Sequence, residues 1–330
     1  MPTMKLLTLM LVAAVSTACG SSDESAAGPA QAAARAPSAA SSSNSRVAAT
    51  AAEIAKEARG KLRCPARPKS APRAANAPVD DIVGVRPGMS YDDAVNVVLC
   101  SHELLIVDNS PRGGFKINTY GQTLRQGFGA VFAEDRINKT SKEIMAEMQN
   151  NAMARSMNKR AADMLGGTSR WYVTTMGLPN EERVIAASRI EAYVDGKAPS
   201  ISGVAAALED KYGPPMRKRE DAQGWFLDWA YDLRDRPVTE TSPMYYGCSA
   251  PSRPESGVNL SPDCGLALSA VIRPKRDNPL IAHTLEIGVV HQAQGYDLLM
   301  ATEQQLERAE QERRAAELDA ATKNADKPTM

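Results

Sequence analysis

A break in composition near residue 79 decides which part of this chain can build a core. Between residues 20 and 78 almost every residue is Ala, Ser, Gly, Pro or charged, and large apolar side chains are rare. A segment of this kind buries too little apolar surface to offset the entropy lost on folding. We therefore expect a disordered tether over 19–78 and ordered structure from about Ile82.

The end of the tether is basic and rich in proline. Two uses fit this composition: contact with anionic lipid or cell-wall polymer, or a solvated spacer extended by its own charge. Over the whole chain, 39 basic and 39 acidic residues cancel, and this balance argues against a protein that coats nucleic acid. No apolar run approaches the roughly 20 residues of a membrane-spanning helix.

The first nineteen residues have the pattern of an export signal. Lys5 is followed by an apolar stretch over 6–15, and small residues then precede Cys19. This ending resembles the lipobox of bacterial lipoproteins, which implies a signal peptide over 1–18 and lipidation of Cys19, with palmitate among the acyl chains. Gly20 is similar to the pattern of lipoproteins sorted to the outer membrane, facing the periplasm. The small residues would also suit ordinary signal peptidase and a soluble periplasmic or secreted protein.

The cysteine count agrees with export. If Cys19 carries the anchor, an even set of four remains, and an oxidising compartment favours disulfide bonds among them. Three pairings are formally possible. Cys248 and Cys264 bracket a Pro/Ser/Gly-rich loop between two predicted strands, so we prefer that pair, which leaves Cys64 with Cys100.

The body contains helix and strand signals in the same order twice. In a first module, 79–197, Ser90 caps a helix and strands are predicted over 104–107, 115–120, 130–133, 171–176 and 183–193. A capping box at Thr140 and Glu143 opens a polar insertion helix, 140–165, which we expect to lie over the sheet. The hairpin turn of this module is predicted at 177–180.

A second module, 198–295, repeats this order. Its helix begins at Ser200 and stops at Gly213, and strands are predicted over 225–231, 266–272 and 284–290. A charged helix and tail follow over 296–330. The predicted class is α+β, with two tandem helix-plus-antiparallel-meander modules.

The segments 84–94 and 207–215 are similar to elements of small envelope modules. They resemble the SmpA/OmlA-type lipoproteins of outer-membrane assembly and the β-lactamase-inhibitor fold. The resemblance implies short helices packed on one face of an antiparallel sheet and an exposed surface that binds other proteins.

No catalytic or cofactor pattern emerges from the sequence. The three histidines, His102, His283 and His291, do not have the spacing of metal ligands, and the chain lacks the usual nucleophile and phosphate-loop motifs. We therefore expect no catalytic residues, no metal and no cofactor. Catalysis by residues distant in sequence stays an alternative.

Two groups of side chains are candidates for partner binding. Met153, Met157 and Met164 form one stripe of the insertion helix, which suits an adaptable binding groove, core packing or, least of the three, capture of Cu(I). Trp225 and Trp229 share a face of one strand and suit either a ligand platform or core. We expect a lipid-anchored envelope protein that binds or scaffolds other envelope proteins. The alternative is an enzyme or small-ligand binder that acts on envelope material.

Overall fold

One antiparallel sheet of eight strands dominates the computed structural model. The structure describes residues 47–65, 74, 76–108, 114–156, 166–253 and 257–326, without the side chains of 150–156. The signal segment, Cys19 and most of the tether lie outside these residues. Two further strands, β1 (Val47–Ala49) and β4 (Arg136–Ile137), pair separately with each other. The sheet strands are β2 (Leu105–Asp108), β3 (Gly127–Phe132), β5 (Ser169–Met176), β6 (Arg183–Ala192), β7 (Arg217–Asp221), β8 (Gly224–Ala230), β9 (Leu266–Pro274) and β10 (Ala282–His291).

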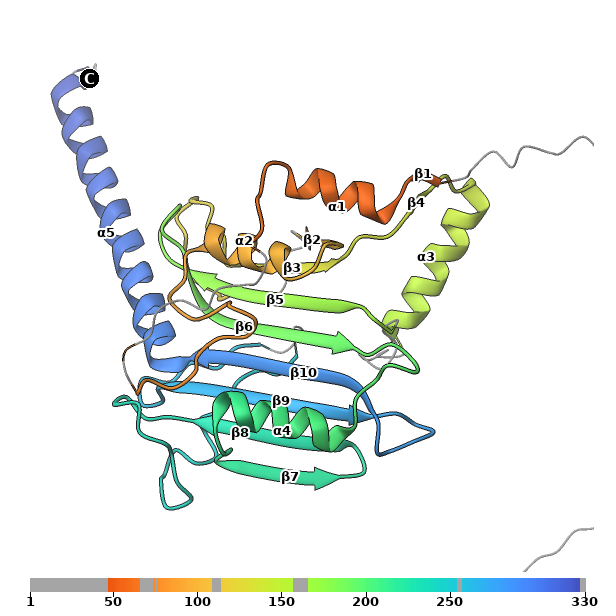
Figure 1. Cartoon of the computed structure of the whole chain (residues 1–330). Helices are drawn as coiled ribbons and strands as arrows, with labels where there is room; N and C mark the ends of the chain where they lie inside the picture. The colour runs from red at the N-terminus through yellow and green to blue at the C-terminus, as the bar shows by residue number, and fades with distance from the viewer. Residues whose placement is uncertain are drawn as a thin grey trace, which may run out of the picture. The chain divides into compact units, whose positions relative to one another are not determined.

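The sheet consists of two four-stranded meanders joined by their last strands. Its order is β2-β3-β5-β6-β10-β9-β8-β7, so β6 and β10 meet at the centre and β2 and β7 form the edges. Helix α2 (Tyr91–Ser101) precedes the first meander and helix α4 (Ile201–Tyr212) precedes the second. This arrangement confirms the predicted α+β class and the repeated helix-plus-meander order. The two meanders share one continuous sheet (Figure 1).

Helices α2 and α4 cover the same face of the sheet, which we call the helix face (Figure 1). Side chains alternate along each strand, so Leu285, Ile287 and Val289 of β10 point to this face. They join one core with the buried faces of both helices, and Trp171 and Trp229 are its largest buried side chains.

The opposite face carries a second core. Ala186, Val290, Ala267 and Ala230 lie in one row across four strands of this face. The long connection between β8 and β9 packs on this row together with a segment near Phe115 and the start of α5 (Gln292–Asn324). Small side chains in the sheet therefore let loops, instead of helices, cover this face.

Helix ends follow the capping rules. Ser90, Thr140 and Ser200 each accept a hydrogen bond from the backbone N–H three residues on, which satisfies a donor that the first turn leaves without a partner. Gly213 ends α4 with a positive φ of 82°, a conformation that glycine adopts without strain. The predicted starts of these helices and the stop at Gly213 are confirmed.

Three expectations need correction. The tether is structured between residues 47 and 64, because Thr50 and Glu53 form a capping box that opens helix α1 (Ala51–Arg59). The segment 115–120 is not a strand: its apolar side chains Phe115 and Ile117 pack on the opposite face as a loop. The C-terminal helix begins at Gln292, four residues before its predicted start at 296.

Within the described ranges, no helix is both long enough and apolar enough to cross a membrane.

Candidate functional site

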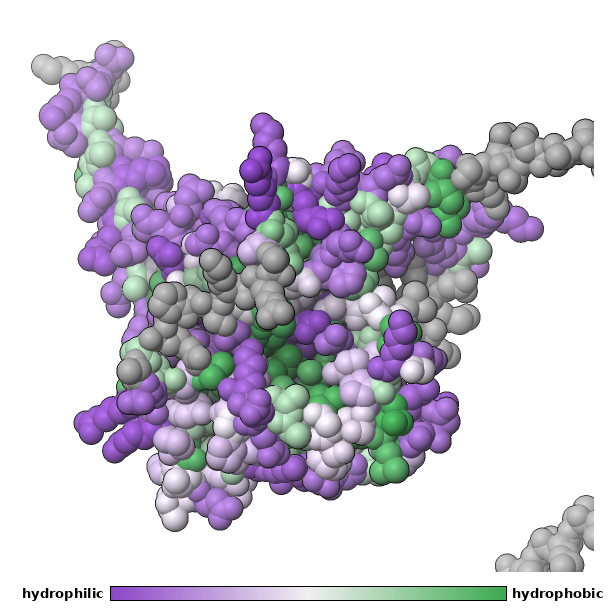
Figure 2. All heavy atoms as spheres, viewed as in Figure 1, coloured by the Kyte–Doolittle hydropathy of each residue, from purple (hydrophilic) through white to green (hydrophobic). Residues whose placement is uncertain are grey.

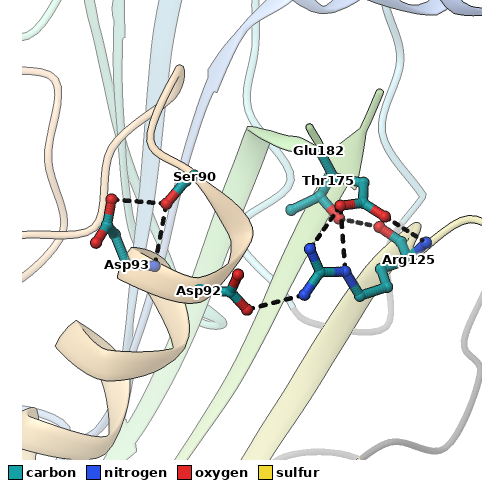
Figure 3. Close-up of polar contacts among 6 residues, drawn as sticks. All are labelled: Ser90, Asp92, Asp93, Arg125, Thr175 and Glu182. Carbon is teal, nitrogen blue, oxygen red and sulfur yellow. Dashed lines mark hydrogen bonds and ion pairs between the residues drawn. The ribbon is translucent and has the colours of Figure 1, made fainter. Parts of the chain in front are cut away.

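Each meander has one buried glutamate held by arginine. In the first, Glu182 stands at the start of β6 and its side chain is 1% exposed. Arg125, just before β3, donates to it from Nη2 at 2.7 Å, from Nε at 3.1 Å and from its backbone N–H at 3.2 Å. Figure 3 shows this cluster, in which Nη1 of Arg125 also reaches Asp92 of α2 at 2.8 Å.

The Arg125 cluster surrounds one guanidinium with two carboxylates. Burial alone would raise the pKa of Glu182, but the hydrogen bonds from Arg125 outweigh burial and hold this pKa below its usual value. The hydroxyl of Thr175 donates to the backbone carbonyl of Arg125, and the guanidinium stacks 4.2 Å from the ring of Tyr91. Each nitrogen of the guanidinium donates one hydrogen bond, and the cluster connects a loop, a hairpin and a helix.

The second meander places Glu286 in the middle of β10, on the opposite face of the sheet. This side chain is also 1% exposed, but two arginines bind it. Arg253 donates from Nε and Nη2 at 2.9 and 3.0 Å, and Arg273 from the same two atoms at 3.1 and 3.4 Å. One carboxylate therefore faces two guanidinium groups.

The histidines have structural contacts and lie apart. Nδ1 of His291 accepts the N–H of Gln294 at the start of α5, and Nδ1 of His102 accepts the N–H of Leu104 after α2. Burial lowers the pKa of both side chains. A cavity of about 750 Å³ lies beside His291, and its lining mixes acidic and basic groups, among them Asp80, Asp93 and Arg183. Among the described residues, no cluster of three His, Cys, Asp or Glu side chains could hold a metal ion.

Both preferred disulfide bonds are present. Cys64, just after α1, is bonded to Cys100 at the end of α2, so the ordered part of the predicted tether is covalently attached to the first meander. Cys248 and Cys264 are fully buried and close the loop on the opposite face. Cys64, in contrast, is exposed.

The predicted partner-binding residues divide into three groups. Trp229 is buried in the core, and its indole N–H donates to the carbonyl of Gly213 at 2.8 Å, so it is not available to a partner in this fold. Trp225 is half-buried on the helix face, with the ammonium of Lys218 4.8 Å from its ring. Met157, Met164 and the side chain of Met153 lie outside the described residues.

The insertion helix α3 (Ser141–Ser156) differs from the expectation that it lies over the sheet. All nine side chains from Ser141 to Gln149 are exposed, so this stretch has no face packed on the rest of the protein. Ile144, Met145 and Met148 lie on one side of it, with 46%, 57% and 62% of their surface exposed.

Helix α3 and the β1–β4 ribbon together form what we call the arm. Figure 1 shows these three elements next to one another, outside the eight-stranded sheet. Val47 of β1 is paired with Ile137 of β4, and both side chains are exposed. Apolar side chains show as green on the surface over the ribbon in Figure 2. Five of the twelve large apolar side chains that are exposed in the described ranges therefore belong to the arm.

Charges on the arm nearly cancel. Residues 134–149 contain three basic and four acidic side chains, and Lys139 pairs with Glu147 at 2.5 Å. The N–H of Ala51 donates to Asp135 at 2.7 Å, which attaches the start of α1 to the arm. The exposed apolar side chains of the arm therefore lie among charged residues with a small excess of acidic ones.

Sequence reasoning missed both arginine–glutamate clusters. Arg125 and Glu182 are 57 residues apart, and nothing local connects them. Glu286 did offer a signal, because it is the only charged residue of the apolar run from Leu285 to Val290, and a charge in a buried strand requires a partner.

No model of a known protein family matches this chain, and no curated protein or solved structure matches it either.

Proposed function

We propose that this chain is a lipid-anchored protein of the bacterial envelope that binds another envelope protein through its arm and catalyses no reaction. The observation that carries the proposal is the exposure of Ile144, Met145 and Met148 on a helix with no packed face in its described part. A helix of this length is marginally stable alone in water, so a partner that covers its apolar side would stabilise it.

A protein partner fits the arm better than a membrane surface does. Helices that lie on membranes carry basic residues on their polar side, because the headgroups are anionic. The arm has four acidic and three basic residues over 134–149, so an anionic bilayer would not attract it. Methionine side chains are flexible and polarizable, and they adapt to the irregular apolar surface of a partner.

The anchor and the compartment rest on separate support. The pattern that ends at Cys19 resembles a lipobox, and the two disulfide bonds agree with an oxidising compartment outside the cytosol. In this proposal the acyl chains on Cys19 hold the protein in the outer membrane, facing the periplasm. Mass spectrometry of the mature N-terminus tests it: acyl chains on Cys19 are expected, and an unmodified cysteine would contradict the anchor.

Site-specific photocrosslinking tests the arm. A photoreactive residue at Met148 should give one discrete protein adduct in intact envelopes, and Ile144→Ser in the same chain should abolish it. Leu280 is a matched control position, because it is an apolar residue with 74% of its surface exposed outside the arm. Equal crosslinking from Leu280 and Met148, or an adduct that survives Ile144→Ser, would rule out the arm as the binding surface.

A further inference from the structure

The edge of the sheet at β7 is a second surface open to a partner, separate from the arm. Among the described strands β7 pairs only with β8, and Figure 1 shows it as the outermost strand on that side. The residues from Lys218 to Asp221 are all exposed. An uncovered edge presents backbone N–H and C=O groups at the spacing of a strand, so a further strand can bond to it.

The hairpin turn determines which backbone groups of β7 point outward. The turn over 222–223 has two residues, which makes Asp221 and Gly224 a hydrogen-bonded pair. Hydrogen-bonded pairs alternate with non-hydrogen-bonded pairs along an antiparallel ladder, so every second residue of β7 bonds to β8. The N–H and C=O groups of Lys218 and Glu220 therefore face away from β8, and a further strand would bond to these two residues.

The charges along β7 change sign in the middle of the strand. Charged residues commonly protect an edge, because strands with charges of one sign repel each other. β7 instead has three basic residues followed by two acidic ones, Arg217-Lys218-Arg219-Glu220-Asp221. Reversing the direction of such a strand exchanges its basic and acidic ends. An antiparallel second copy of β7 is therefore complementary in charge.

One register of two antiparallel copies uses both features. The outward residues have to form the hydrogen-bonded pairs, so Lys218 lies opposite Lys218 or Glu220 of the second copy, or Glu220 lies opposite Glu220. The two registers with like charges are repulsive, and each overlaps over only three of the five residues of β7. The register with Lys218 opposite Glu220 pairs all five residues and forms two hydrogen bonds at each of these two pairs.

The contacts of Lys218 and Glu220 within one copy leave room for this pairing. Lys218 lies 3.1 Å from Glu209 of α4 and 3.9 Å from Glu220. The Glu220 side chain is 51% exposed, and no cation lies closer to it within the part of the chain that the structure describes. A lysine directly opposite from a second copy would therefore give Glu220 a nearer partner.

The other side of the strand tolerates the same register. Arg217 would lie opposite Asp221 of the second copy, which is a favourable pair. Arg219 would lie opposite Arg219, but its guanidinium is 4.1 Å from the ring of Phe226 on β8 and 3.3 Å from Asp221. The guanidinium therefore lies over β8, away from the edge, and its charge is compensated within its own copy.

We propose that two copies of this chain form a symmetric dimer through antiparallel pairing of their β7 strands, with Lys218 of each copy opposite Glu220 of the other. The two eight-stranded sheets then form one continuous sheet. Five strand residues from each copy are far fewer than the roughly 20–30 of a standard interface, so the dimer is weak and depends on concentration. The arm takes no part in it, so the dimer and the partner of the arm are tested separately.

Cysteine crosslinking of the full chain in intact envelopes tests the register. Arg219 would form a non-hydrogen-bonded pair on the symmetry axis, where the two Cα atoms are about 4.5 Å apart and a disulfide bond can form. Arg219→Cys should therefore give a covalent dimer on mild oxidation. Asp221→Cys is the matched control on the same face of the strand, because its two copies would lie about 13 Å apart along the strand. No dimer from Arg219→Cys, or equal amounts from both variants, would overturn the proposal.

Charge reversal in the purified full chain tests the ion pairs. Lys218→Glu places glutamates opposite each other and Glu220→Lys places lysines opposite each other, so each should weaken self-association about tenfold in sedimentation equilibrium. A mixture of the two variants has opposite charges at both pairs and should associate about as tightly as the unmodified chain. Thermal unfolding of each variant controls for the lost contact with Glu209. Unchanged self-association in both single variants, or a mixture that associates as weakly as they do, would overturn the proposal.

Discussion

The two meanders of the sheet have the same topology, yet they hold their buried glutamates in different ways. Glu182 in the first meander has one arginine partner, and that arginine also contacts a second carboxylate, Asp92. Glu286 in the second meander has two arginine partners. Both side chains are 1% exposed, so the two clusters differ in the groups that bind the carboxylate and not in its burial.

In the first cluster one arginine is shared by two carboxylates, and in the second one carboxylate is shared by two arginines. The Arg125 cluster uses its donors to connect α2, the start of β6 and the loop before β3. Arg253 and Arg273 both hold the Glu286 carboxylate, so either guanidinium remains when the other is removed. Two equally buried carboxylates therefore depend to different degrees on a single arginine.

The disulfide bonds provide the test with the largest expected effect. Cys64–Cys100 closes a loop of 36 residues and Cys248–Cys264 a loop of 16, and loop-closure entropy alone gives about 4 and about 3 kcal/mol. We expect Cys64→Ala/Cys100→Ala to lower the free energy of unfolding by the larger amount, measured by urea denaturation. If Cys248→Ala/Cys264→Ala instead loses more unfolding free energy, the packing of the two buried sulfur atoms contributes more to stability than the difference in loop length does.

Reduction of the folded protein is the control for this pair. Cys64 is exposed and Cys248 and Cys264 are buried, so mild dithiothreitol should open the first bond while the second stays intact. Peptide mapping after alkylation would reveal simultaneous opening, which would contradict the assigned burial.

The next largest effect compares the two arginine–glutamate clusters directly. Arg125→Ala leaves Glu182 buried without its cation and should cost about 3 kcal/mol of unfolding free energy. Arg253→Ala should cost only about 1 kcal/mol, because Arg273 still pairs with Glu286. Urea denaturation at pH 7 measures both values.

The same urea denaturation at acidic pH is the control for Arg125→Ala. The lowered pKa of Glu182 means that its stabilising effect is present above the usual carboxyl pKa and is lost as pH falls through the lowered value. The gap between Arg125→Ala and the unmodified protein should therefore narrow in acid. Equal losses in the two variants at pH 7 would show that the second arginine on Glu286 does not protect the buried carboxylate.

A smaller effect concerns the buried tryptophans of the two halves. The indole N–H of Trp229 donates to Gly213, whereas that of Trp171 is buried and has no hydrogen-bond partner among the described residues. Phenylalanine removes the donor in either place, so Trp229→Phe should cost about 1 kcal/mol more than Trp171→Phe. Thermal or urea unfolding of the two variants measures the difference in unfolding free energy. Equal losses would show that only the smaller volume of the phenylalanine ring affects stability.

The smallest effect is a pH dependence of the second half. Burial lowers the pKa of His291 and outweighs the attraction of Asp235 and Asp80. The unfolded chain therefore takes up a proton at higher pH than the folded one, so stability is complete above about pH 6.5 and falls as pH is lowered.

His291→Asn isolates this contribution, because asparagine can still cap α5 but does not titrate. The loss of unfolding free energy between pH 7 and pH 5 should be smaller in this variant. His102→Asn is the matched change at the more exposed histidine of the first half. An unchanged pH profile in His291→Asn would show that other groups cause the loss.

Periodicity explains how much of the fold could be predicted. In the sequence of the central strands, apolar and polar residues alternate or apolar residues form a continuous run between turn residues. Most of these strands were therefore predicted. Strand β7 was missed because Arg217 to Asp221 are all charged; it is an edge strand, held by backbone pairing with β8. Helix α1 was missed because composition outweighed its capping box at Thr50 and Glu53, which would have located it.

The candidate sites were predicted less well because they depend on contacts between distant residues. Arg253 and Arg273 meet on Glu286 only because Gly288 and Ser188 let the loop at Pro251 cross the sheet closely. The disulfide pairs were predicted because four cysteines allow few combinations. Helix α3 was expected to lie over the sheet, because an apolar stripe on a helix does not show by itself what covers it.

The meeting of β6 and β10 at the centre of the sheet also affects how the protein is made. Chains are synthesised from the N-terminus, and β6 ends at Ala192 whereas its partner β10 begins at Ala282. The first meander therefore spends the synthesis of about ninety residues with the unpaired backbone of β6 exposed, although β6 is interior in the finished sheet. An open edge of this kind invites pairing with other chains, so a holding chaperone would be most useful during this interval.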